Sequence, residues 1–286
     1  MEPHIYVQNI IPLLEYEKLH NIKNGLIDYT QIMMSYHSNR IEGSMLSLDD
    51  TASLYDTHTI NSDGIIRERD INDSEGHFFM FRRMLEHLNE PLSENIIKMY
   101  HGALKTYSVY DHDKGFNIGE YKNLANSIGG LIQTVPPEDV KKEMQEWLER
   151  YRMMSDIGQN YLSLAKSHAS FEHIHPFQDG NGRVGRMILY KQCLENNLVP
   201  CVIQENMSKS YKKALKEITT GKDNGILLAN ILEESAKQYR ENTQNFIDAF
   251  IKMKQNNYSR PMRAGHKETT EPSQSHDTSQ LNKPRI

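Results

Sequence analysis

The chain has 286 residues, of which 37% are hydrophobic and 25% charged, and its formal net charge is −5, so it can fold around a large core. The negative charge disfavours general affinity for nucleic acid, no apolar stretch approaches the length of a membrane span, and the N-terminus lacks the pattern of a signal peptide. Cys193 and Cys201 do not suggest a disulfide framework, so we expect a cytoplasmic protein. From the net charge and the lack of a long apolar stretch we expect neither a nucleic-acid nor a membrane partner.

Hydrophobic periodicity predicts helices along nearly the whole chain, which places it in the mostly α class. The helix over 26–41 ends just before Gly43, a residue that suits a C-terminal cap. The helix from Pro137 to about Met154 begins with a proline and two acidic residues, as helix starts prefer. The pattern divides the chain into four parts: an N-terminal helical region (1–90), a central unit (91–221), a C-terminal helix (222–254) and a polar tail without fixed structure (255–286).

The most informative stretch is residues 175–186, which read His-Pro-Phe-Gln-Asp-Gly-Asn-Gly-Arg-Val-Gly-Arg. Helical periodicity on both sides, Pro176 and the turn residues from Asp179 onward predict a loop that ends at a helix N-terminus. Backbone N–H groups point outward at such a terminus and suit a phosphate. Gly180 and Gly182 allow an anion to approach the backbone closely.

Each polar side chain of this run has a chemical role that suits a bound triphosphate. Asp179 is a hard oxygen ligand for Mg²⁺ that bridges phosphate oxygens. Arg183 and Arg186 share one helix face, and their planar guanidinium groups match phosphate oxygens. His175 can accept a proton from an attacking hydroxyl near neutral pH, and Asn181 can bond a phosphate oxygen.

A transition-metal site is an alternative interpretation of the same region. His168, His173, His175 and Asp179 include residue types that bind such metals. The glycines and the arginine pair would then have no role, which disfavours this interpretation. A lone histidine, arginine or aspartate would more often be structural or a solvated charge, but the dense combination has no joint structural reason.

The run resembles the signature of the Fic (filamentation induced by cAMP) family, His-Pro-Phe-x-Asp/Glu-Gly-Asn-Gly/Lys-Arg-x-x-Arg, at every fixed position. The resemblance implies a Fic-fold helical core over 91–221 with a small β-hairpin flap. It implies transfer of AMP from ATP to a Ser, Thr or Tyr hydroxyl of a target protein. In this reading His175 is the general base, Asp179 holds Mg²⁺ and Arg186 holds the γ-phosphate. The other signature positions surround the phosphates: Gly180, Asn181 and Gly182 as an anion hole, and Arg183 at the outer phosphates.

A second match lies upstream, where residues 38–43 read Ser-Asn-Arg-Ile-Glu-Gly and resemble the family's inhibitory pattern, Ser/Thr-x-x-x-Glu-Gly/Asn. Ser38 and Glu42 are one helical turn apart and share a face. The resemblance implies an inhibitory helix over about 26–43 whose Glu42 pairs with Arg186, so that ATP binds unproductively. Because the pattern precedes the core, the chain resembles class II of the family.

Residues 119–137 resemble the flap, which Gly-x-Phe/Tyr-Arg usually introduces in the family. We expect a strand over Ile128 to Ile132, with Gly130 and Leu131 beside the nucleotide. A target segment would pair with the exposed strand edge. Lys122 stands where many members have arginine, which leaves the role of that position open. A plain surface loop is the alternative interpretation.

Residues 210–215 resemble the helix that covers the adenine in the family, often written Tyr-Tyr-x-x-Leu. Of the two aromatic residues only Tyr211 is kept, because Lys212 stands in the second place. The resemblance implies Tyr211 as a neighbour of the adenine. The alternative interpretation is that Tyr211 is a half-buried helix residue without a role at the adenine.

We therefore expect an autoinhibited protein adenylyltransferase that uses ATP and Mg²⁺ and acts on a protein hydroxyl. Relatives often modify themselves and dimerise, so self-modification and a homodimer are further options. Three alternatives stay open. The same residues could transfer UMP, phosphocholine or the γ-phosphate, or remove AMP with water positioned by Glu42. The chain could also be a nucleotide-sensing module without turnover, which the intact His175 disfavours.

Overall fold

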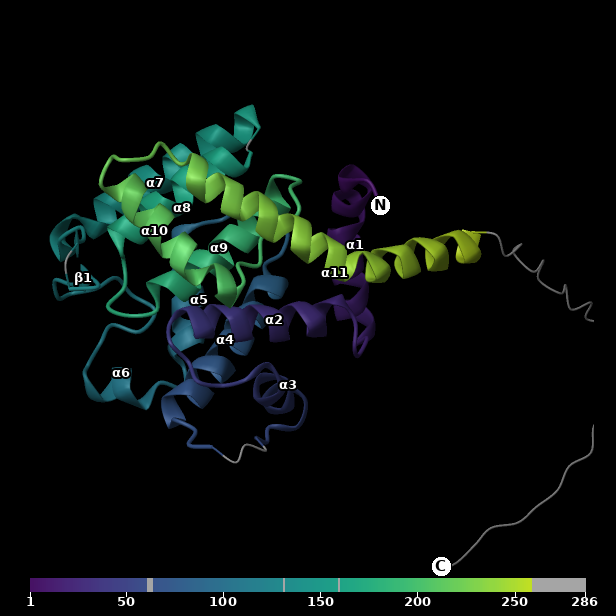
Figure 1. Ribbon diagram of the computed structural model, residues 1–286, viewed down its shortest axis with the longest axis horizontal. Coiled ribbons are helices and arrows are strands. Elements are labelled where there is room, and N and C mark those ends of the chain that lie inside the picture. Colours follow the sequence, from purple (N-terminus) through teal and green to yellow (C-terminus); the bar gives the residue numbers. More distant parts are fainter. Residues whose placement is uncertain (61–63, 131, 159, 259–286) are drawn as a thin grey trace, which may run out of the picture.

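The computed structural model describes residues 1–60, 64–130, 132–158 and 160–258. The expected mostly α class is confirmed, with one small antiparallel sheet (Figure 1). The tail was predicted to lack fixed structure from residue 255, but residues 255–258 are the end of α11, and the rest of the tail lies outside the described residues. In chain order the elements are α1 (Pro3–His20), α2 (Leu26–Ile41), α3 (Leu48–Thr57), α4 (Glu68–Glu86), α5 (Glu94–Lys105), α6 (Val109–Asp113), β1 (Ser127–Ile128), β2 (Ile132–Gln133), α7 (Pro137–Ile157), α8 (Tyr161–Ile174), α9 (Asn181–Glu195), the 3₁₀ turn η1 (Glu205–Met207), α10 (Ser208–Thr219) and α11 (Ile226–Tyr258).

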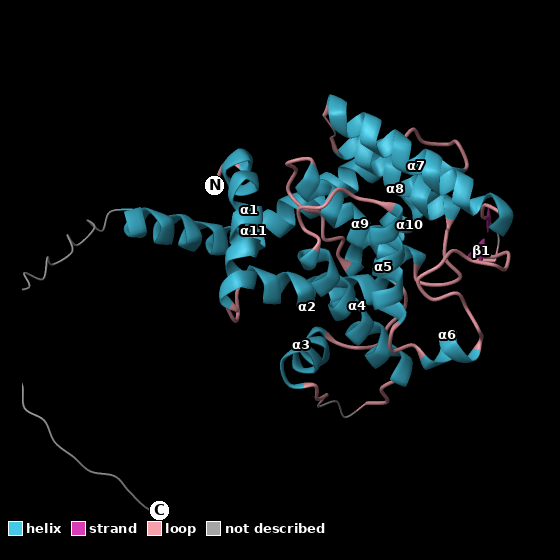
Figure 2. Ribbon diagram, turned by 180° about the vertical axis from the view of Figure 1, so that it is seen from behind, coloured by secondary structure: helices cyan, strands magenta, loops and turns pink. Residues whose placement is uncertain are grey.

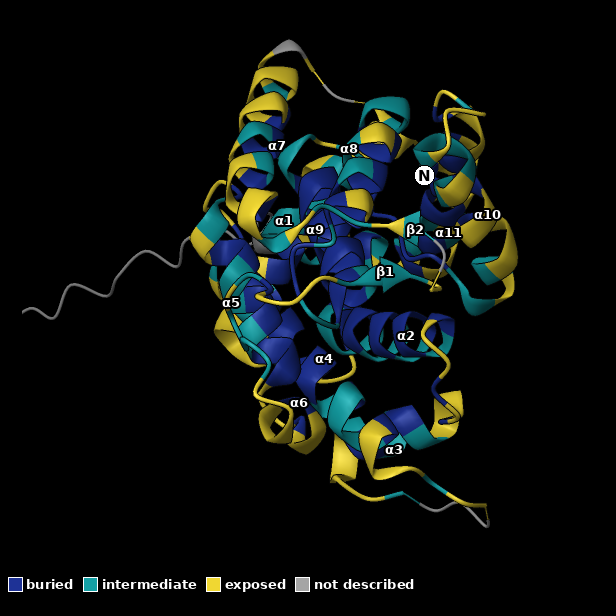
Figure 3. Ribbon diagram, turned by 90° about the vertical axis from the view of Figure 1, so that its left-hand side faces the viewer, coloured by how far each residue is buried: buried dark blue, intermediate teal, exposed yellow. Residues whose placement is uncertain are grey.

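Helix α9 lies at the centre of the fold and is buried along nearly its whole length (Figure 3). It packs against α8, α5, α4 and α2. Its buried Lys191 ammonium is satisfied by two backbone carbonyls, His87 O at 3.0 Å and Leu88 O at 3.1 Å. Because a helix surrounded by packed neighbours cannot shift without disturbing the core, its N-terminus is a rigid platform.

Helix α11 crosses the molecule and joins the N-terminal region to the centre (Figure 1). The hydroxyl of Tyr239 on α11 lies 2.6 Å from Thr30 Oγ1 on α2 and 3.1 Å from Tyr190 Oη on α9. One cluster of buried side chains includes residues of α1, α2, α4, α5 and α7 to α11, so the unit boundaries expected at 90 and 221 stay predictions. No helix in the described ranges has both the length and the apolar character needed to cross a membrane.

Helix α2 has the bounds that the sequence predicts and is fixed at its first turn. The carboxylate of Glu17 on α1 accepts hydrogen bonds from the backbone N–H groups of Leu26 and Ile27, each at 2.8 Å. At the other end Gly43 has φ +92°, and its N–H donates to Arg40 O at 3.0 Å. The glycine therefore ends the helix in a conformation that other residues rarely adopt, and Glu42 projects from this end.

The continuous strand expected over Ile128 to Ile132 is wrong. Ser127 and Ile128 pair with Gln133 and Ile132 across a tight turn, which Figure 2 shows as the small strands of the fold. Gly129 and Gly130 have φ +59° and +71°, and this left-handed backbone reverses the chain instead of extending it. A hairpin flap is thus present, but its tip lies where a strand was predicted.

Candidate active site

Residues 175–180 form the expected loop between α8 and the N-terminus of α9. His175 ends α8 in the left-handed region, with φ 53°, and Gly180 precedes α9 with φ 83°. A Cβ atom on Gly180 would also crowd Leu104 at 3.0 Å and Lys105 at 3.1 Å. Glycine is therefore required at Gly180 by both conformation and space, and the backbone N–H groups at the start of α9 face outward from a fixed loop.

The side chain of Asn181 holds this loop together. Its Oδ1 accepts from the Phe177 N–H and its Nδ2 donates to Phe177 O, both at 2.8 Å. The residue is 1% exposed, so its amide shapes the loop from within rather than facing a ligand. The side-chain amide that was expected to bond a phosphate oxygen is thus occupied by Phe177.

His175 has the geometry of a general base. Its Nδ1 lies 3.2 Å from Glu172 O, and because a carbonyl can only accept, Nδ1 carries the proton and Nε2 is the free acceptor. Burial, with a smaller effect of the Lys122 charge, lowers the pKa of His175 to about 4. The imidazole is therefore neutral at pH 7 and able to take a proton.

Arg186 is bound by Ser38 on α2 and by Glu42, the residue that caps the C-terminus of α2. Its Nε donates to Ser38 Oγ at 2.9 Å, and its second nitrogen donates to Ser38 O at 3.0 Å and to Glu42 Oε1 at 2.7 Å. Burial alone would raise the pKa of Glu42, but Arg186 and the nearby Arg183 and Lys212 hold it below its usual value. The sequence-predicted pair of Glu42 and Arg186 is thus a charged contact in this structure.

Gly182 makes room for that contact. A Cβ atom built on Gly182 would overlap the Glu42 carboxylate and lie 3.0 Å from the Arg186 guanidinium. The glycine expected to admit an anionic ligand therefore admits the carboxylate of Glu42. The same space cannot hold a phosphate group and Glu42 together.

Asp179 lies among three cations. Its Oδ2 accepts from Lys105, from Arg183 at 3.3 Å and from Arg69 at 3.3 Å. Burial alone would raise the pKa of Asp179, but the charges of Arg183 and Lys105 lower it far below its ordinary value. The carboxylate is therefore ionised, as a metal ligand must be. All three contacts use Oδ2, so Oδ1 is the oxygen that fits Mg²⁺.

A cavity of about 460 Å³ lies beside the signature loop, and neither Asp179 nor Arg183 lines it. It is bordered by Glu42, His175, Gly182 and Arg186 on one side and by the flap and α10 on the other. Its size is in the range of sites for small molecules and nucleotides. The expected flap contact Gly130 does not line it, although the adjacent Gly129 does. Leu131 lies outside the described residues.

Helix α10 supplies one wall of this cavity and also holds α2. Tyr211 lines the cavity and is 2% exposed, so the half-buried alternative does not apply. Its hydroxyl lies 2.7 Å from His168 Nε2. Lys212 donates to Ile41 O at 2.7 Å, the last carbonyl of α2. Lys212, which stands where the motif has its second aromatic residue, thus contacts the C-terminal end of α2.

A second set of contacts joins α2 to the turn before α10. The Glu205 carboxylate accepts from Tyr36 Oη and from Arg40 Nε, each at 2.6 Å, and the Glu205 N–H donates to His37 Nδ1 at 3.2 Å. We call these three bonds the Glu205 contact. It holds α2 independently of Arg186.

Comparison with known proteins finds a family match for the segment that contains the signature run. Residues 91–193, which include the whole signature run, match the model of the Fic/DOC family. This segment is of the Fic/DOC family. The matched segment does not include α2 or α10. The family match therefore says nothing about the contacts of Glu42 and Tyr211, which are seen in the structure only.

Proteins similar to this chain include the "Protein adenylyltransferase Fic" of Drosophila mojavensis and that of Drosophila melanogaster, each 25% identical over 189 residues. The match covers 65% of this chain but only 36% and 37% of those two proteins. This chain therefore spans less than two-fifths of the length of the curated relatives it matches.

Solved structures share the Fic fold. A Fic-domain signalling protein from Bacteroides thetaiotaomicron has a TM-score of 0.67 at 20% identity, with 84% of this chain and 98% of that chain covered. Fic-1 from C. elegans has a TM-score of 0.61 at 18% identity, with 87% of this chain and 74% of that chain covered. The wide coverage extends the similarity of fold beyond the matched residues 91–193.

The alternative transition-metal site is not assembled around the Fic signature. His168 is buried against Tyr211, whereas His173 is exposed on α8. Within the described ranges, no group of three or more histidine, cysteine or acidic side chains could hold a metal ion. The histidines near the signature thus do not converge on one point.

Sequence reasoning missed two charged residues next to the Fic signature. Glu172 lines the cavity, and its burial raises its pKa to about 7. Its position one helical turn before His175 was the only signal for it. Lys105, which bonds Asp179, is 1% exposed and also pairs with Asp111 at 2.7 Å. No local pattern marks Lys105, because its partner is 74 residues away.

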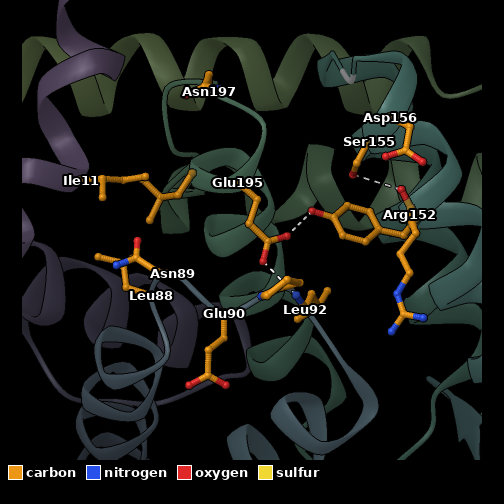
Figure 4. A pocket seen from close by; sticks show the side chains of 13 residues that line it. Ile11, Leu88, Asn89, Glu90, Leu92, Arg152, Ser155, Asp156, Glu195 and Asn197 are labelled. Atoms are coloured by element: carbon orange, nitrogen blue, oxygen red, sulfur yellow. Dashed lines mark hydrogen bonds between the residues drawn. The ribbon is translucent and has the colours of Figure 1, made fainter.

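A second hollow, of about 450 Å³ (Figure 4), shares no lining residue with the cavity beside His175 and Arg186. One of its polar groups is the Glu195 carboxylate, which accepts from the Leu92 N–H at 3.0 Å and from the Tyr151 hydroxyl. Lys191 also pairs with Glu195 at 3.2 Å. The carboxylate is thus used to join α9 to α7 and to the start of α5, and we assign no ligand to this hollow.

Proposed function

We propose that this Fic protein is an autoinhibited protein adenylyltransferase that moves AMP from ATP to a Ser, Thr or Tyr hydroxyl of a target protein. The proposal is carried by one observation. Glu42 accepts a hydrogen bond from Arg186 at 2.7 Å in the cavity that also contains His175. The names of the relatives support a transferase role for the family.

In the proposed reaction the target hydroxyl oxygen attacks the α-phosphorus of ATP, the bond between that phosphorus and the bridging oxygen breaks, and pyrophosphate leaves. His175 Nε2 takes the hydroxyl proton. The N-terminus of α9, with Gly180 and Gly182, binds the phosphates, and Arg183 balances their charge. Mg²⁺ held by Asp179 would supply further neutralisation of charge on the phosphate oxygens.

In the proposed inhibited state, of the class II type, Arg186 cannot hold the γ-phosphate because Glu42 and Ser38 already use its nitrogens. ATP then lacks the contact that orients its outer phosphate, and the α-phosphorus is not aligned with the attacking hydroxyl. Removal of the Glu42 carboxylate frees both Arg186 and the space above Gly182. We therefore expect Glu42→Gly to activate transfer.

The test uses three purified proteins: wild type, Glu42→Gly, and Glu42→Gly combined with His175→Ala. Each is incubated with Mg²⁺ and with ATP labelled at either the α- or the γ-phosphate, alone and with a cell lysate as a source of targets. We expect protein-bound α-label that is at least about tenfold stronger in Glu42→Gly than in wild type, since displacing a charge-assisted hydrogen bond is worth about 1.5–3 kcal/mol. The His175→Ala control should give none.

Label from the γ-phosphate alone would replace the proposal with phosphoryl transfer. If ATP labelled at either position leaves no label on protein, UTP and CDP-choline are the donors to test next. Tight ATP binding without turnover in Glu42→Gly would instead favour a nucleotide-sensing module. Labelling of the purified chain by itself would establish self-modification, whereas a homodimer and a cytoplasmic location remain predictions from the sequence.

Removal of AMP is a second candidate function, favoured by the position of Glu42. Its side chain is 39% exposed and borders the same cavity as His175, so its carboxylate can orient a water molecule. Self-labelled Glu42→Gly protein, freed of ATP, is the substrate for this test. Release of AMP on adding wild type but not Glu42→Gly protein would establish the activity.

A further inference from the structure

Lys122 is a buried lysine beside the signature loop whose partners are all neutral. It is 3% exposed, and its ammonium donates to Asn126 Oδ1 at 2.7 Å, Thr134 Oγ1 at 2.8 Å and Ile174 O at 3.4 Å. In the part of the chain that the structure describes, no carboxylate forms an ion pair with it. Burial lowers its pKa to about 8. A buried charge without a counter-ion is costly, which indicates a specific role.

The three acceptors belong to the two legs of the flap and to α8, the helix that His175 follows. Asn126 precedes β1 and Thr134 follows β2, and the Thr134 hydroxyl also lies 2.6 Å from Asn126 Oδ1. Ile174 is the last residue of α8. A single ammonium group therefore joins both legs of the hairpin to the residue next to the proposed base.

Backbone contacts of the same segments complete this junction. The Lys122 N–H donates to Pro176 O at 2.8 Å, and Asn126 Nδ2 donates to Phe177 O at 3.0 Å. The flap segment is thus joined to α8 and the signature loop through three donor groups: the Lys122 ammonium, the Lys122 N–H and the Asn126 amide. Any movement of the hairpin relative to His175 would break several of these bonds.

The Lys122 charge also acts on His175 directly. Four groups around the imidazole influence its protonation besides burial. Lys122 opposes it, whereas Glu42, Asp179 and the Glu172 carbonyl favour it. In an activated protein Glu42 moves away, so the balance shifts further toward the effect of Lys122.

We propose that Lys122 is a positioning residue for AMP transfer: its ammonium group fixes the flap to the end of α8 and places a buried positive charge near the proposed base, His175. This rests on the proposed function, because the base and the flap matter only if a hydroxyl group is to be modified. An arginine at this position would keep both the charge and the donors. The replacement of arginine by Lys122 in this chain therefore preserves the role.

The experiment separates the charge of Lys122 from its hydrogen bonds. The Lys122→Met and Lys122→Gln variants both remove the charge. The glutamine variant keeps a hydrogen-bond donor and serves if the methionine variant does not fold. Lys122→Arg keeps the charge, and Thr134→Val removes one acceptor without altering the charge. The ring of His175 is titrated by NMR in ¹³C-histidine-labelled protein, with His175→Ala for assignment, and AMP transfer is measured against pH in the Glu42→Gly background.

We expect Met and Gln to raise the titration midpoint of His175 by about one pH unit, a typical effect of one nearby charge. Lys122→Arg and Thr134→Val should leave it unchanged. The acid limb of transfer should move with the midpoint, and Met and Thr134→Val should both speed amide exchange in β1 and β2. An unchanged midpoint in both neutral variants would overturn the proposal. Since the titration needs no turnover, it separates this failure from a failure of the proposed function.

Discussion

The Glu42 carboxylate and the Arg186 guanidinium meet at 2.7 Å although they are 144 positions apart in the chain. Gly182 of the signature leaves the space for this contact. Arg186 is 4% exposed, so its charge is shielded from water and depends on Glu42 and Ser38 for partners. A buried charge in this position is stable only with a partner, and a phosphate is the partner that could replace Glu42.

Removing Arg186 should therefore impair transfer even where inhibition is absent. In the Glu42→Gly background we expect Arg186→Ala to lower α-label incorporation by about ten- to a hundredfold, the equivalent of about 1.5–3 kcal/mol for a hydrogen bond to a charged group. Arg150→Ala, at an exposed arginine of α7, is the matched control and should have no effect. Full activity without Arg186 would remove its assignment to the γ-phosphate.

The Glu205 contact should add to inhibition, because it holds α2 in place. Arg40 and Glu205 have side chains 34% and 33% exposed, so their ion pair contributes less than about 1 kcal/mol. We expect Arg40→Glu or Glu205→Arg to raise transfer by about two- to fivefold and to speed amide exchange in α2.

The charge-swapped double variant, Arg40→Glu with Glu205→Arg, should restore both values toward wild type. In the Glu42→Gly background none of the three changes should raise transfer further, because the inhibitory carboxylate is already gone. Activation that persists there would show that the contact acts on catalysis and not on α2.

Asp179→Asn should weaken the dependence of ATP binding on Mg²⁺. An amide oxygen is a poorer ligand than a carboxylate for a hard divalent cation, and the loss of charge also leaves Lys105 with Asp111 as its remaining acidic partner. Calorimetric titration of ATP with and without Mg²⁺ should show a smaller gain from the metal than in wild type. Asp139→Asn, at an exposed residue of α7, is the control, and an equal gain in both variants would contradict the role of Asp179.

The fold should lose stability as the pH falls below neutral. Burial lowers the pKa of five histidines from 6.5 to between about 3 and 4: His37, His77, His101, His168 and His175. The unfolded chain then binds more protons than the folded chain between about pH 6.5 and pH 4, so stability falls as pH decreases through this window. Glu172, whose pKa is raised to about 7, acts in the opposite direction.

Urea unfolding at pH 7.5 and pH 5.5 measures this effect. Each buried histidine should lower the free energy of unfolding by up to about 1.4 kcal/mol over that range. His77→Gln should reduce the difference between the two pH values, while His4→Gln, at an exposed position of α1, should not. Equal stability at both pH values in wild type would show that these histidines are not neutral in the folded state.

Local spacing in the sequence was sufficient for several parts of this structure. Helical periodicity and Gly43 predicted α2 with its bounds, because amphipathic period and capping are properties of neighbouring residues. The turn residues after Asp179 predicted the loop before α9 for the same reason. The strand expected around Gly130 was wrong, because two consecutive glycines took the left-handed backbone of a turn.

The tertiary structure alone decided which distant groups meet. The contacts of Lys105 with Asp179, of Lys212 with the end of α2, and of Lys122 with the flap and α8 are set by how the segments pack. Motif positions mark Lys122 and Lys212 but do not reveal their partners. The tertiary structure also decided that the Asn181 amide faces into its own loop. The sequence by itself determined the chemical groups of the site and the elements that hold them. Their protonation and their partners depend on burial and on charges from distant segments, and these exist only once the chain has folded.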